Sequence, residues 1–195
     1  DSFGKDRAMT DPTRLPILVA GTGPAGLIAA LALADRQVPV VLAGPRAVGR
    51  DDRRTTALMG PSLLLLERLG LMAALSSDAA PLTTMRIIDA TSRLVRAPTV
   101  TFRASEIGEP HFGLNIPDAH LNAVLEEAVA AQPLIERHEA LVTEWLPAAE
   151  HVSARLDDGS LVSACLAVAA DGRNSPAREA AGIRTWRREL PQTAV

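Results

Sequence analysis

The chain of 195 residues contains one cysteine, no tyrosine and only 3% aromatic residues, and its formal net charge is −3. Cys165 alone cannot form a disulfide within the chain or a thiolate cluster around a metal, which fits an intracellular, reducing compartment. The small negative charge provides no basic surface for nucleic acid, and so few aromatic side chains provide little for stacking on bases. We therefore expect a cytoplasmic protein without a nucleic-acid partner.

Histidines are also few, and no catalytic acid or base can be named from the sequence. The four histidines lie in different predicted elements without the spacing of metal ligands, so no metal is expected: His111, His120, His138 and His151. No Ser-His-Asp or Cys-His arrangement is present that would support nucleophilic catalysis. The adjacent acids Glu126 and Glu127 do not face each other on a helix, and we interpret both as solvated.

One strong local pattern is present at residues 15–42, which read LPILVAGTGPAGLIAALALADRQVPVVL. A short apolar run precedes glycines in GxGxxG spacing, an entirely apolar segment follows them, and a second apolar run ends the stretch. This order predicts a strand, a turn, a helix and a second strand, the βαβ unit that binds dinucleotides. Residues 15–34 are uncharged and imitate a membrane span or a signal peptide, but the glycines and the following strand argue against both.

At each of the three positions in this turn, a physical requirement favours glycine. Gly21 lets the chain leave the strand tightly, Gly23 lets the backbone approach a pyrophosphate, and Gly26 lets the helix pack close to the sheet. Pro24 stands where the first helical turn tolerates proline. The unpaired N–H groups and the positive dipole end of this helix then predict an anion site.

The middle of the chain predicts alternating loops, helices and short strands. In order, these are a loop at 43–54, a helix at 61–71 capped by Ser62 and ended by Gly70, strands at 85–88, 94–95 and 100–102, a helix at 118–131 capped by Asp118, and strands at 140–146 and 151–156. A hairpin turn then leads into the apolar run 161–170, which is typical of a strand buried on both faces. Cys165 within this run is expected to fill the core.

Asp171 and Gly172 follow this apolar run. Ligands of a parallel sheet bind beyond the carboxyl ends of its strands, so Asp171 should lie on the same edge as the glycine turn. A carboxylate there can bind a ribose or ribityl hydroxyl, or hold a backbone amide. The alternative is that the two residues only make a turn and that Ser175 caps a helix at 176–181.

Four motifs, in this order and spacing, resemble the flavin-dependent aromatic hydroxylases. They are GTGPAG at 21–26, D-x-R-x-x-A-L at 52–58, GLNIPDAHL at 113–121 and AVAADGRNSPAREAAGI at 167–183. From residue 16 to the end, the chain is similar to the ubiquinone-biosynthesis branch of the para-hydroxybenzoate hydroxylase-like family. The resemblance implies an α/β fold with a Rossmann-like, FAD-binding parallel sheet, a β-hairpin insertion and the start of a substrate domain.

The domain division that we predict has five parts. They are a disordered or vector-derived start (1–14), a first FAD-binding βαβ part (15–74), the start of a substrate domain (75–115), the continued FAD-binding domain (116–186) and the truncated beginning of the substrate-domain sheet (187–195).

The resemblance also implies which residues bind the cofactor. These are Gly21, Gly23, Pro24, Ala25, Gly26, Arg54, Asp118, Asp171 and Gly172. The glycine turn would cradle the FAD pyrophosphate, and the guanidinium of Arg54 would reach the flavin side of the same phosphates, since its fork suits paired oxygens. Asp171 and Gly172 match a motif near the pyrophosphate and the path of the nicotinamide donor.

The activity implied is FAD-dependent hydroxylation of an aromatic ring through a flavin C4a-hydroperoxide, with NAD(P)H as electron donor. In the ubiquinone branch the small aromatic substrate is a prenylated phenol. A polyprenylated substrate partitions into membranes, so peripheral contact with a membrane or with a biosynthetic assembly is expected. A homodimer is left open.

Two features depart from the family pattern. Relatives end the second strand with an acid that binds the adenosine ribose, whereas this chain has Gly44, so two hydroxyl contacts of about 1 kcal/mol each would be missing. Relatives also continue through a substrate-covering sheet and a later Gly-Asp motif, so the chain resembles the N-terminal part of a longer enzyme. Three alternatives stay open: a non-catalytic fragment or assembly module without FAD, a nicotinamide-dependent dehydrogenase, and a flavin halogenase or hydroxylase of another substrate.

Overall fold

A four-stranded parallel sheet forms the centre of the computed structural model, which describes residues 15–46 and 53–190. Its strand order is β12-β1-β2-β8, with β1 at Ile17–Ala20, β2 at Val40–Ala43, β8 at Ile135–His138 and β12 at Leu166–Ala169. The predicted βαβ unit is confirmed, because helix α1 (Pro24–Asp35) joins β1 to its parallel neighbour β2. Pro24 occupies the start of α1, where a helix has no N–H bond to lose.

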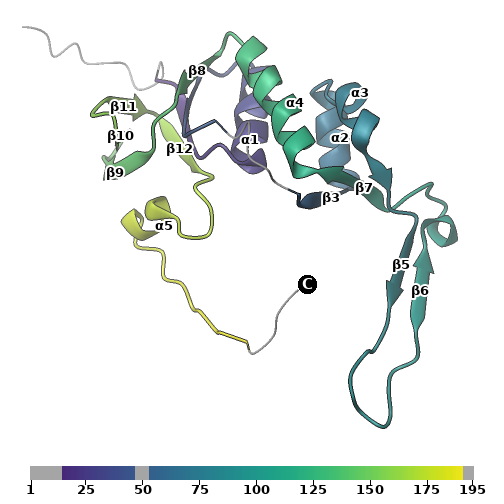
Figure 1. The fold of residues 1–195 in the computed structure, drawn as a ribbon. Coiled ribbons are helices and arrows are strands. Elements are labelled where there is room, and N and C mark those ends of the chain that lie inside the picture. Colours follow the sequence, from purple (N-terminus) through teal and green to yellow (C-terminus); the bar gives the residue numbers. More distant parts are fainter. Residues whose placement is uncertain (1–14, 47–52, 191–195) are drawn as a thin grey trace, which may run out of the picture.

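Helices cover one face of this sheet, and an antiparallel sheet covers the other (Figure 1). Helix α1 and helix α4 (Asp118–Ala131) share a core with Val19 and Leu42. Leu18 and Val41 belong to a second core on the opposite face. Because successive side chains of a strand point to opposite faces, each apolar run of the sequence supplies both layers.

The antiparallel sheet is a three-stranded meander in the order β11-β10-β9, formed by β9 (Val142–Pro147), β10 (Val152–Leu156) and β11 (Leu161–Ala164). The predicted single strand at 161–170 is wrong, because the chain leaves β11 and enters β12 across Cys165. This cysteine is exposed rather than part of the core, and its amide donates to the Pro16 carbonyl at 3.1 Å. Without a glycine or proline between them, two short apolar strands read as one long strand.

Strand β8 was not predicted. Its four residues, IERH, include three polar side chains, since β8 is an edge strand of the parallel sheet. Arg137 of β8 donates two hydrogen bonds to Glu126 of α4, at 3.1 and 3.2 Å, and both side chains are largely buried. The interpretation of Glu126 as solvated is therefore wrong, whereas Glu127 is exposed.

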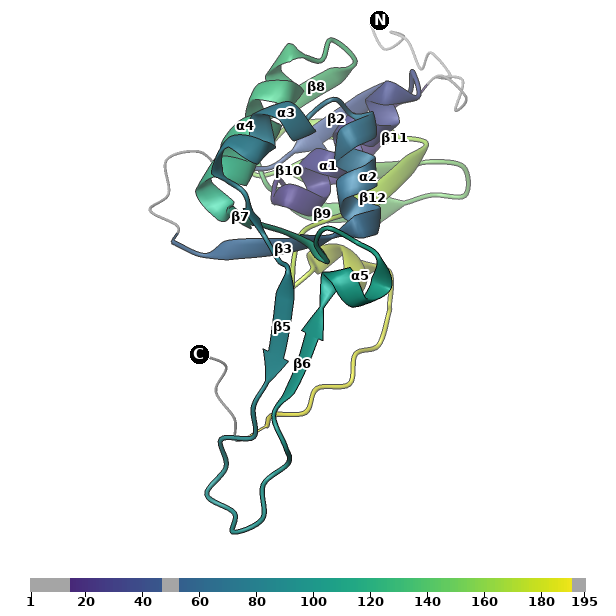
Figure 2. The same ribbon diagram turned by 90° about the vertical axis from the view of Figure 1, so that its right-hand side faces the viewer.

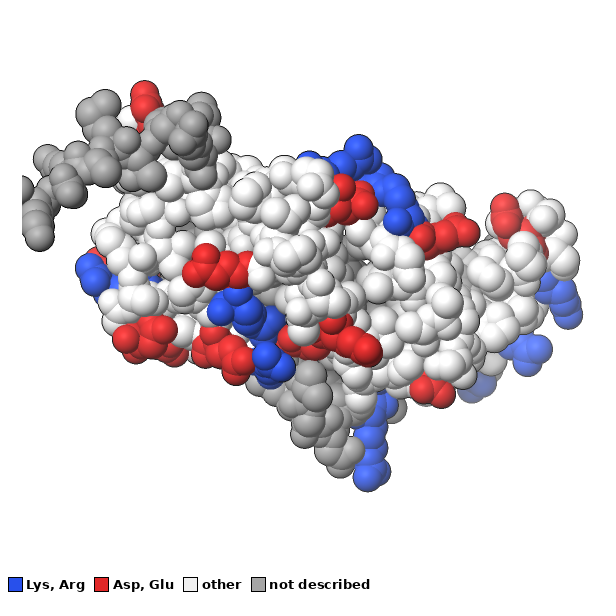
Figure 3. All heavy atoms as spheres, turned by 90° about the horizontal axis from the view of Figure 1, so that it is seen from above, with Lys and Arg blue, Asp and Glu red and all other residues white. Residues whose placement is uncertain are grey.

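Most other described ion pairs join exposed side chains. Acidic and basic side chains lie next to one another on the face seen from above (Figure 3). Arg155 and Glu144, 3.0 Å apart in the meander, are a typical pair, with about half of each side chain exposed. Such pairs stabilise a fold by about 1 kcal/mol or less. Removing one partner of the buried pair of Glu126 and Arg137 is therefore expected to cost more stability than breaking any of the exposed pairs.

A second antiparallel sheet, in the order β3-β7-β4, lies near one end of α4. It is formed by β3 (Thr55–Met59), β7 (Gly113–Pro117) and β4 (Ala80–Pro81). Helices α2 (Gly60–Arg68) and α3 (Met72–Leu75) follow β3 in the chain. Two short 3-10 helices lie at Ser76–Asp78 and Ala104–Ile107. Gly70 follows α2 with φ +74°, as expected of a helix stop. Ser62 lies inside α2 and does not cap it, because the helix begins at Gly60.

A two-stranded hairpin of β5 (Thr84–Ile87) and β6 (Val100–Arg103) projects from the rest of the molecule (Figures 1 and 2). Leu94 and Val95, predicted to form a strand, instead lie exposed in the loop of this hairpin. The Asp89 carboxylate accepts hydrogen bonds from the Ala97 and Thr91 amides across the same loop, and they hold the pKa of Asp89 below its usual value.

Among the described residues, the last are a short helix, α5 (Pro176–Ala180), and a segment to residue 190 without helix or strand. Within 15–46 and 53–190, no helix has both the length and the apolar character needed to cross a membrane. The uncharged stretch of 15–34, which imitates a span, is divided between β1, the turn and α1.

Candidate functional site

The turn between β1 and α1 requires two of its three glycines for steric reasons. At Gly21, φ is +108°, and a Cβ would lie 2.1 Å from the Ala170 carbonyl oxygen. At Gly26, a Cβ would lie 1.9 Å from the carbonyl oxygen of Gly21. A Cβ on Gly23, by contrast, would meet nothing within 4 Å. Gly21 and Gly26 therefore serve close backbone packing, and Gly23 borders open space.

The N-terminus of α1 faces the same turn with unused hydrogen-bond donors. The Leu27 amide bonds to the Gly23 carbonyl at 3.1 Å, which is the first turn of the helix. The amides of Ala25 and Gly26 precede this first bond, and they have no acceptor within the helix. No acidic side chain lies in the first turn of α1 to offset the helix dipole. This end of the helix is therefore suited to an anion.

A cavity of about 480 Å³ opens at the carboxyl ends of β1, β2 and β12. Four of the predicted site residues line it together: Gly21, Gly23, Asp171 and Gly172. This agrees with the expectation that the two motifs meet at one sheet edge. Thr22, Pro45, Leu141, Val142 and Asn174 also line the cavity and were not predicted. Thr22 and Asn174 stand inside the motifs, but Leu141 and Val142 follow the unpredicted strand β8.

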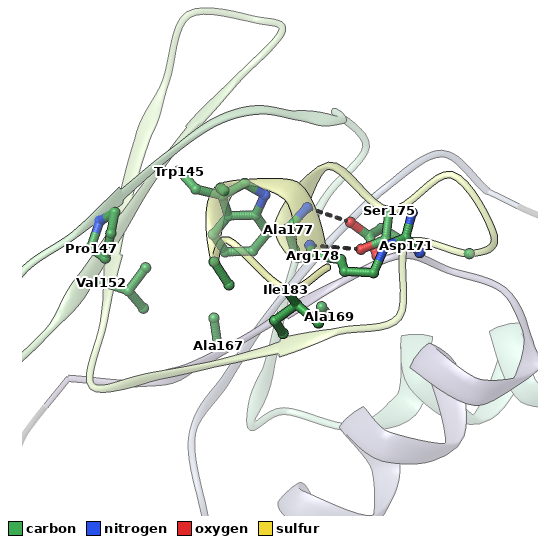
Figure 4. Close-up of a pocket in the computed structure, with 13 residues that line it drawn as sticks. Trp145, Pro147, Val152, Ala167, Ala169, Asp171, Ser175, Ala177, Arg178 and Ile183 are labelled. Carbon is green, nitrogen blue, oxygen red and sulfur yellow. Dashed lines mark hydrogen bonds between the residues drawn. The ribbon is translucent and has the colours of Figure 1, made fainter. Parts of the chain in front are cut away.

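Asp171 holds the start of α5. Its Oδ2 accepts a hydrogen bond from the Ala177 amide at 3.0 Å, and Ser175 Oγ accepts one from the Arg178 amide at 3.0 Å (Figure 4). The predicted cap at Ser175 is thus confirmed, and the Asp171 carboxylate holds a backbone amide. A carboxylate accepts about four hydrogen bonds, so this contact does not exhaust Asp171.

Ser175→Ala should lower the free energy of unfolding by about 1 kcal/mol, because the Arg178 amide loses its acceptor. Chemical denaturation followed by circular dichroism measures the change. Ser62→Ala is the matched control, since this serine lies inside α2 without a cap, and it should change stability by less than about 0.5 kcal/mol. Equal losses in both variants would contradict the assigned cap.

A second cavity of about 480 Å³ lies between α5, β12 and the meander (Figure 4). Its lining is mainly apolar and includes Trp145, Val152 and Ile183. The indole nitrogen of Trp145 is buried and has no hydrogen-bond partner among the described residues. Asp171 and Gly172 line both cavities, so their turn forms the wall between them.

Arg54 and Asp118 form a separate group next to β3. The Asp118 carboxylate accepts a hydrogen bond from Thr56 Oγ1 at 2.6 Å and lies 3.8 Å from Arg54 Nε. The Asp118 amide also donates to the Arg54 carbonyl at 2.9 Å. The predicted capping role of Asp118 is wrong, because α4 begins at this residue and its side chain turns to β3 instead. Asp52 of the same motif lies outside the described residues.

Gly44 follows β2 in a backbone conformation that L side chains rarely adopt. Its φ is +147°, and a Cβ would lie 2.8 Å from Thr22 Oγ1. The Thr22 hydroxyl is fixed there because it donates to the Pro45 carbonyl. The backbone conformation at residue 44 therefore favours the glycine that the sequence has there over the acid that relatives have.

Comparison with known proteins gives hydroxylases and monooxygenases, and also the dialkyldecalin synthase of Streptomyces rugosporus, which is 25% identical over 167 residues that cover 86% of this chain and 34% of the synthase. The family model described as an FAD binding domain matches residues 14–192. Ubiquinone hydroxylase UbiL of Rhodospirillum rubrum is 29% identical over 194 aligned residues, which cover 92% of this chain and 42% of the relative. Among solved structures, the flavin-dependent monooxygenase PieE in complex with FAD and substrate is 22% identical with a TM-score of 0.70, covering 87% of this chain and 32% of PieE.

The p-nitrophenol 4-monooxygenase PnpA from Pseudomonas putida shares the fold as well. It is 21% identical with a TM-score of 0.71, and the match covers 86% of this chain and 43% of PnpA. The chain therefore spans less than half the length of the relatives that it matches.

Proposed function

Because the chain belongs to the FAD binding domain family, we propose that its glycine turn and its Asp171–Gly172 turn bind the pyrophosphate of FAD. The observation that carries this proposal is that both turns line one cavity at the carboxyl ends of three parallel strands. Ligands of open parallel sheets bind at such an edge. The family assignment disfavours the nicotinamide-dependent dehydrogenase, which the same βαβ opening left as an alternative.

The residues present fit a pyrophosphate. Gly23 leaves open space where a Cβ would stand, and the amides of Ala25 and Gly26 are available as donors at the positive end of α1. Pro24 contributes no donor but fixes the start of the helix. Gly172, with φ +87°, turns the backbone where it lines the same cavity. These groups bind and orient the phosphates through the backbone.

Arg54 is proposed as the side chain that reaches the flavin side of these phosphates. Its guanidinium is largely exposed beside the Asp118 carboxylate, and the Asp118 amide fixes the Arg54 backbone by its bond to the carbonyl. Thr56 in turn holds the Asp118 carboxylate. A planar guanidinium is suited to paired phosphate oxygens. Asp118 thus acts as a positioning residue for Arg54.

For the whole protein we propose hydroxylation of an aromatic ring, with a prenylated phenol of ubiquinone biosynthesis as substrate and NAD(P)H as donor. The ubiquinone hydroxylase relative supports this substrate class. Bound FAD would supply the activation of dioxygen, and the protein would position the ring and exclude water. Contact with a membrane surface or a biosynthetic assembly, and a homodimer, are proposals for the whole protein as well.

The hairpin β5–β6 is proposed to belong to the substrate domain. Its register places Met85 opposite Phe102 and Ile87 opposite Val100, so that one face is apolar, and all four side chains are exposed. An isolated two-stranded hairpin is marginally stable in water. This apolar face therefore supports the assignment of 75–115 to a part of the enzyme that packs against further structure.

Titration of the 195-residue chain with FAD, followed by flavin fluorescence and absorption, tests the cofactor proposal. We expect saturable binding, and Arg54→Ala should weaken it by at least about tenfold, because a charged hydrogen bond to phosphate contributes about 1.5–3 kcal/mol. Arg155→Ala, which removes an exposed ion pair of the meander, is the control and should leave affinity unchanged. Failure of the wild-type chain to bind FAD would favour the non-catalytic module.

A further inference from the structure

An acidic side chain lies next to Gly44, but on the neighbouring strand. Strand β8 runs parallel to β2 with His138 beside Ala43, and the Gly44 amide donates to the His138 carbonyl at 3.0 Å. The residue that follows His138 is Glu139. Two adjacent parallel strands therefore end together, one followed by a glycine at which a side chain would be strained and the other by a glutamate.

The Glu139 carboxylate is held toward the β2 side of this edge. Its Oε1 accepts a hydrogen bond from Arg46 Nε at 2.6 Å. Arg46 directly follows Pro45, and Leu141 comes two residues after Glu139. Pro45 and Leu141 both line the cavity that contains the glycine turn. The Glu139–Arg46 pair therefore joins two segments whose neighbouring residues line the cavity, and we call the position of this pair the rim.

We infer that Glu139 binds the hydroxyls of the adenosine ribose of FAD, in place of the acid that Gly44 excludes. This inference rests on the proposed function. A carboxylate accepts about four hydrogen bonds, so the bond from Arg46 leaves acceptors for two neighbouring hydroxyls. The side chains of Glu139 and Arg46 are 55% and 57% exposed, which leaves the pair accessible to a ligand. Arg46 acts as a positioning residue, because its guanidinium fixes the carboxylate.

The same rim could instead bind a ribose 2′-phosphate. In dinucleotide sites that lack the acid after the second strand, a nearby arginine takes this phosphate. Here the arginine is already paired with Glu139, whose negative charge would repel a phosphate. The observed pairing therefore favours hydroxyl groups.

The test compares ADP with 2′-deoxy-ADP by isothermal titration calorimetry on the 195-residue chain. The wild-type chain should bind ADP at least about tenfold more tightly, since one hydrogen bond to a charged group is lost with the hydroxyl. In Glu139→Ala this ratio should fall to near one, and FAD should bind at least about tenfold more weakly. Glu136→Ala is the matched control, because this exposed acid of β8 pairs with His138 and stands beside Val41, within the strand.

Three results would overturn the inference and leave the proposed function in place. If the ratio of the ADP and 2′-deoxy-ADP affinities stays the same in Glu139→Ala, a group other than Glu139 binds the 2′-hydroxyl. Tighter binding of adenosine 2′,5′-bisphosphate than of ADP, lost in Arg46→Ala, would show that the rim selects a phosphate. FAD binding by the wild type without any preference for ADP over 2′-deoxy-ADP would reject the role of Glu139 alone. Absence of both FAD and ADP binding would instead reject the proposed function together with the inference.

Discussion

Gly26→Ala is expected to destabilise the fold by about 3 kcal/mol, whereas Gly23→Ala, three residues earlier, is expected to leave stability unchanged. The reason is the position of the added Cβ. At residue 26 it would lie 1.9 Å from the Gly21 carbonyl oxygen, a backbone atom that cannot rotate away. At residue 23 it would meet nothing within 4 Å. The helix would have to move off the strand in the first variant only.

The same pair of variants separates folding from ligand binding. Urea denaturation gives the free energy of unfolding, and titration with FAD gives the affinity. Gly23→Ala should retain the wild-type denaturation curve but bind FAD at least about tenfold more weakly, because the added methyl group occupies the space for the pyrophosphate. Wild-type FAD affinity in Gly23→Ala would contradict the placement of the pyrophosphate at this turn. Wild-type stability in Gly26→Ala would contradict the close contact of α1 with the turn.

Arg137→Met is expected to lower the free energy of unfolding by about 3–5 kcal/mol. Arg137 is the partner of Glu126 in a largely buried pair between β8 and α4, and its loss leaves a buried carboxylate without its cation. The double variant Glu126→Leu/Arg137→Met removes both charges and should recover most of this loss, since apolar side chains of similar volume replace such pairs well.

Denaturation of the single and double variants measures the coupling between the two side chains. Arg155→Met is the control, because it breaks the exposed pair with Glu144 and should cost about 1 kcal/mol or less. A loss in Arg137→Met no greater than in Arg155→Met would show that the carboxylate of Glu126 finds water or another partner. A double variant as unstable as Arg137→Met would assign the loss to packing rather than to charge.

The features predicted well from the sequence are those that local chemistry determines. The βαβ unit follows from the spacing of Gly21, Gly23 and Gly26 between apolar runs, and α4 follows from its helical period. The position of Asp171 beside the glycine turn was also predictable, because the carboxyl ends of parallel strands meet at one edge. For the βαβ unit and α4, the sequence pattern predicts the observed elements, whereas for Asp171 it predicts the position and leaves the role open.

The features that were missed depend on partners far apart in the chain. Strand β8 has little apolar character, and its place next to β2 is set by pairing across more than ninety residues. Glu126 was assigned to solvent because its partner Arg137 belongs to that same unpredicted strand. Asp118 was assigned as a cap because Thr56, which holds its carboxylate, lies in β3, 62 residues earlier in the chain. The role of Glu139 was hidden for the same reason, since only the register of β8 brings it to Gly44.

The exposed position of Cys165 has a practical consequence. It is the only thiol of the chain and lies where the chain passes from the meander to the parallel sheet, with its amide bonded to Pro16. A maleimide fluorophore or a nitroxide would therefore attach at one known place without any engineered cysteine. Its signal would report whether the two sheets separate before the helical layer melts, which bulk denaturation curves do not resolve.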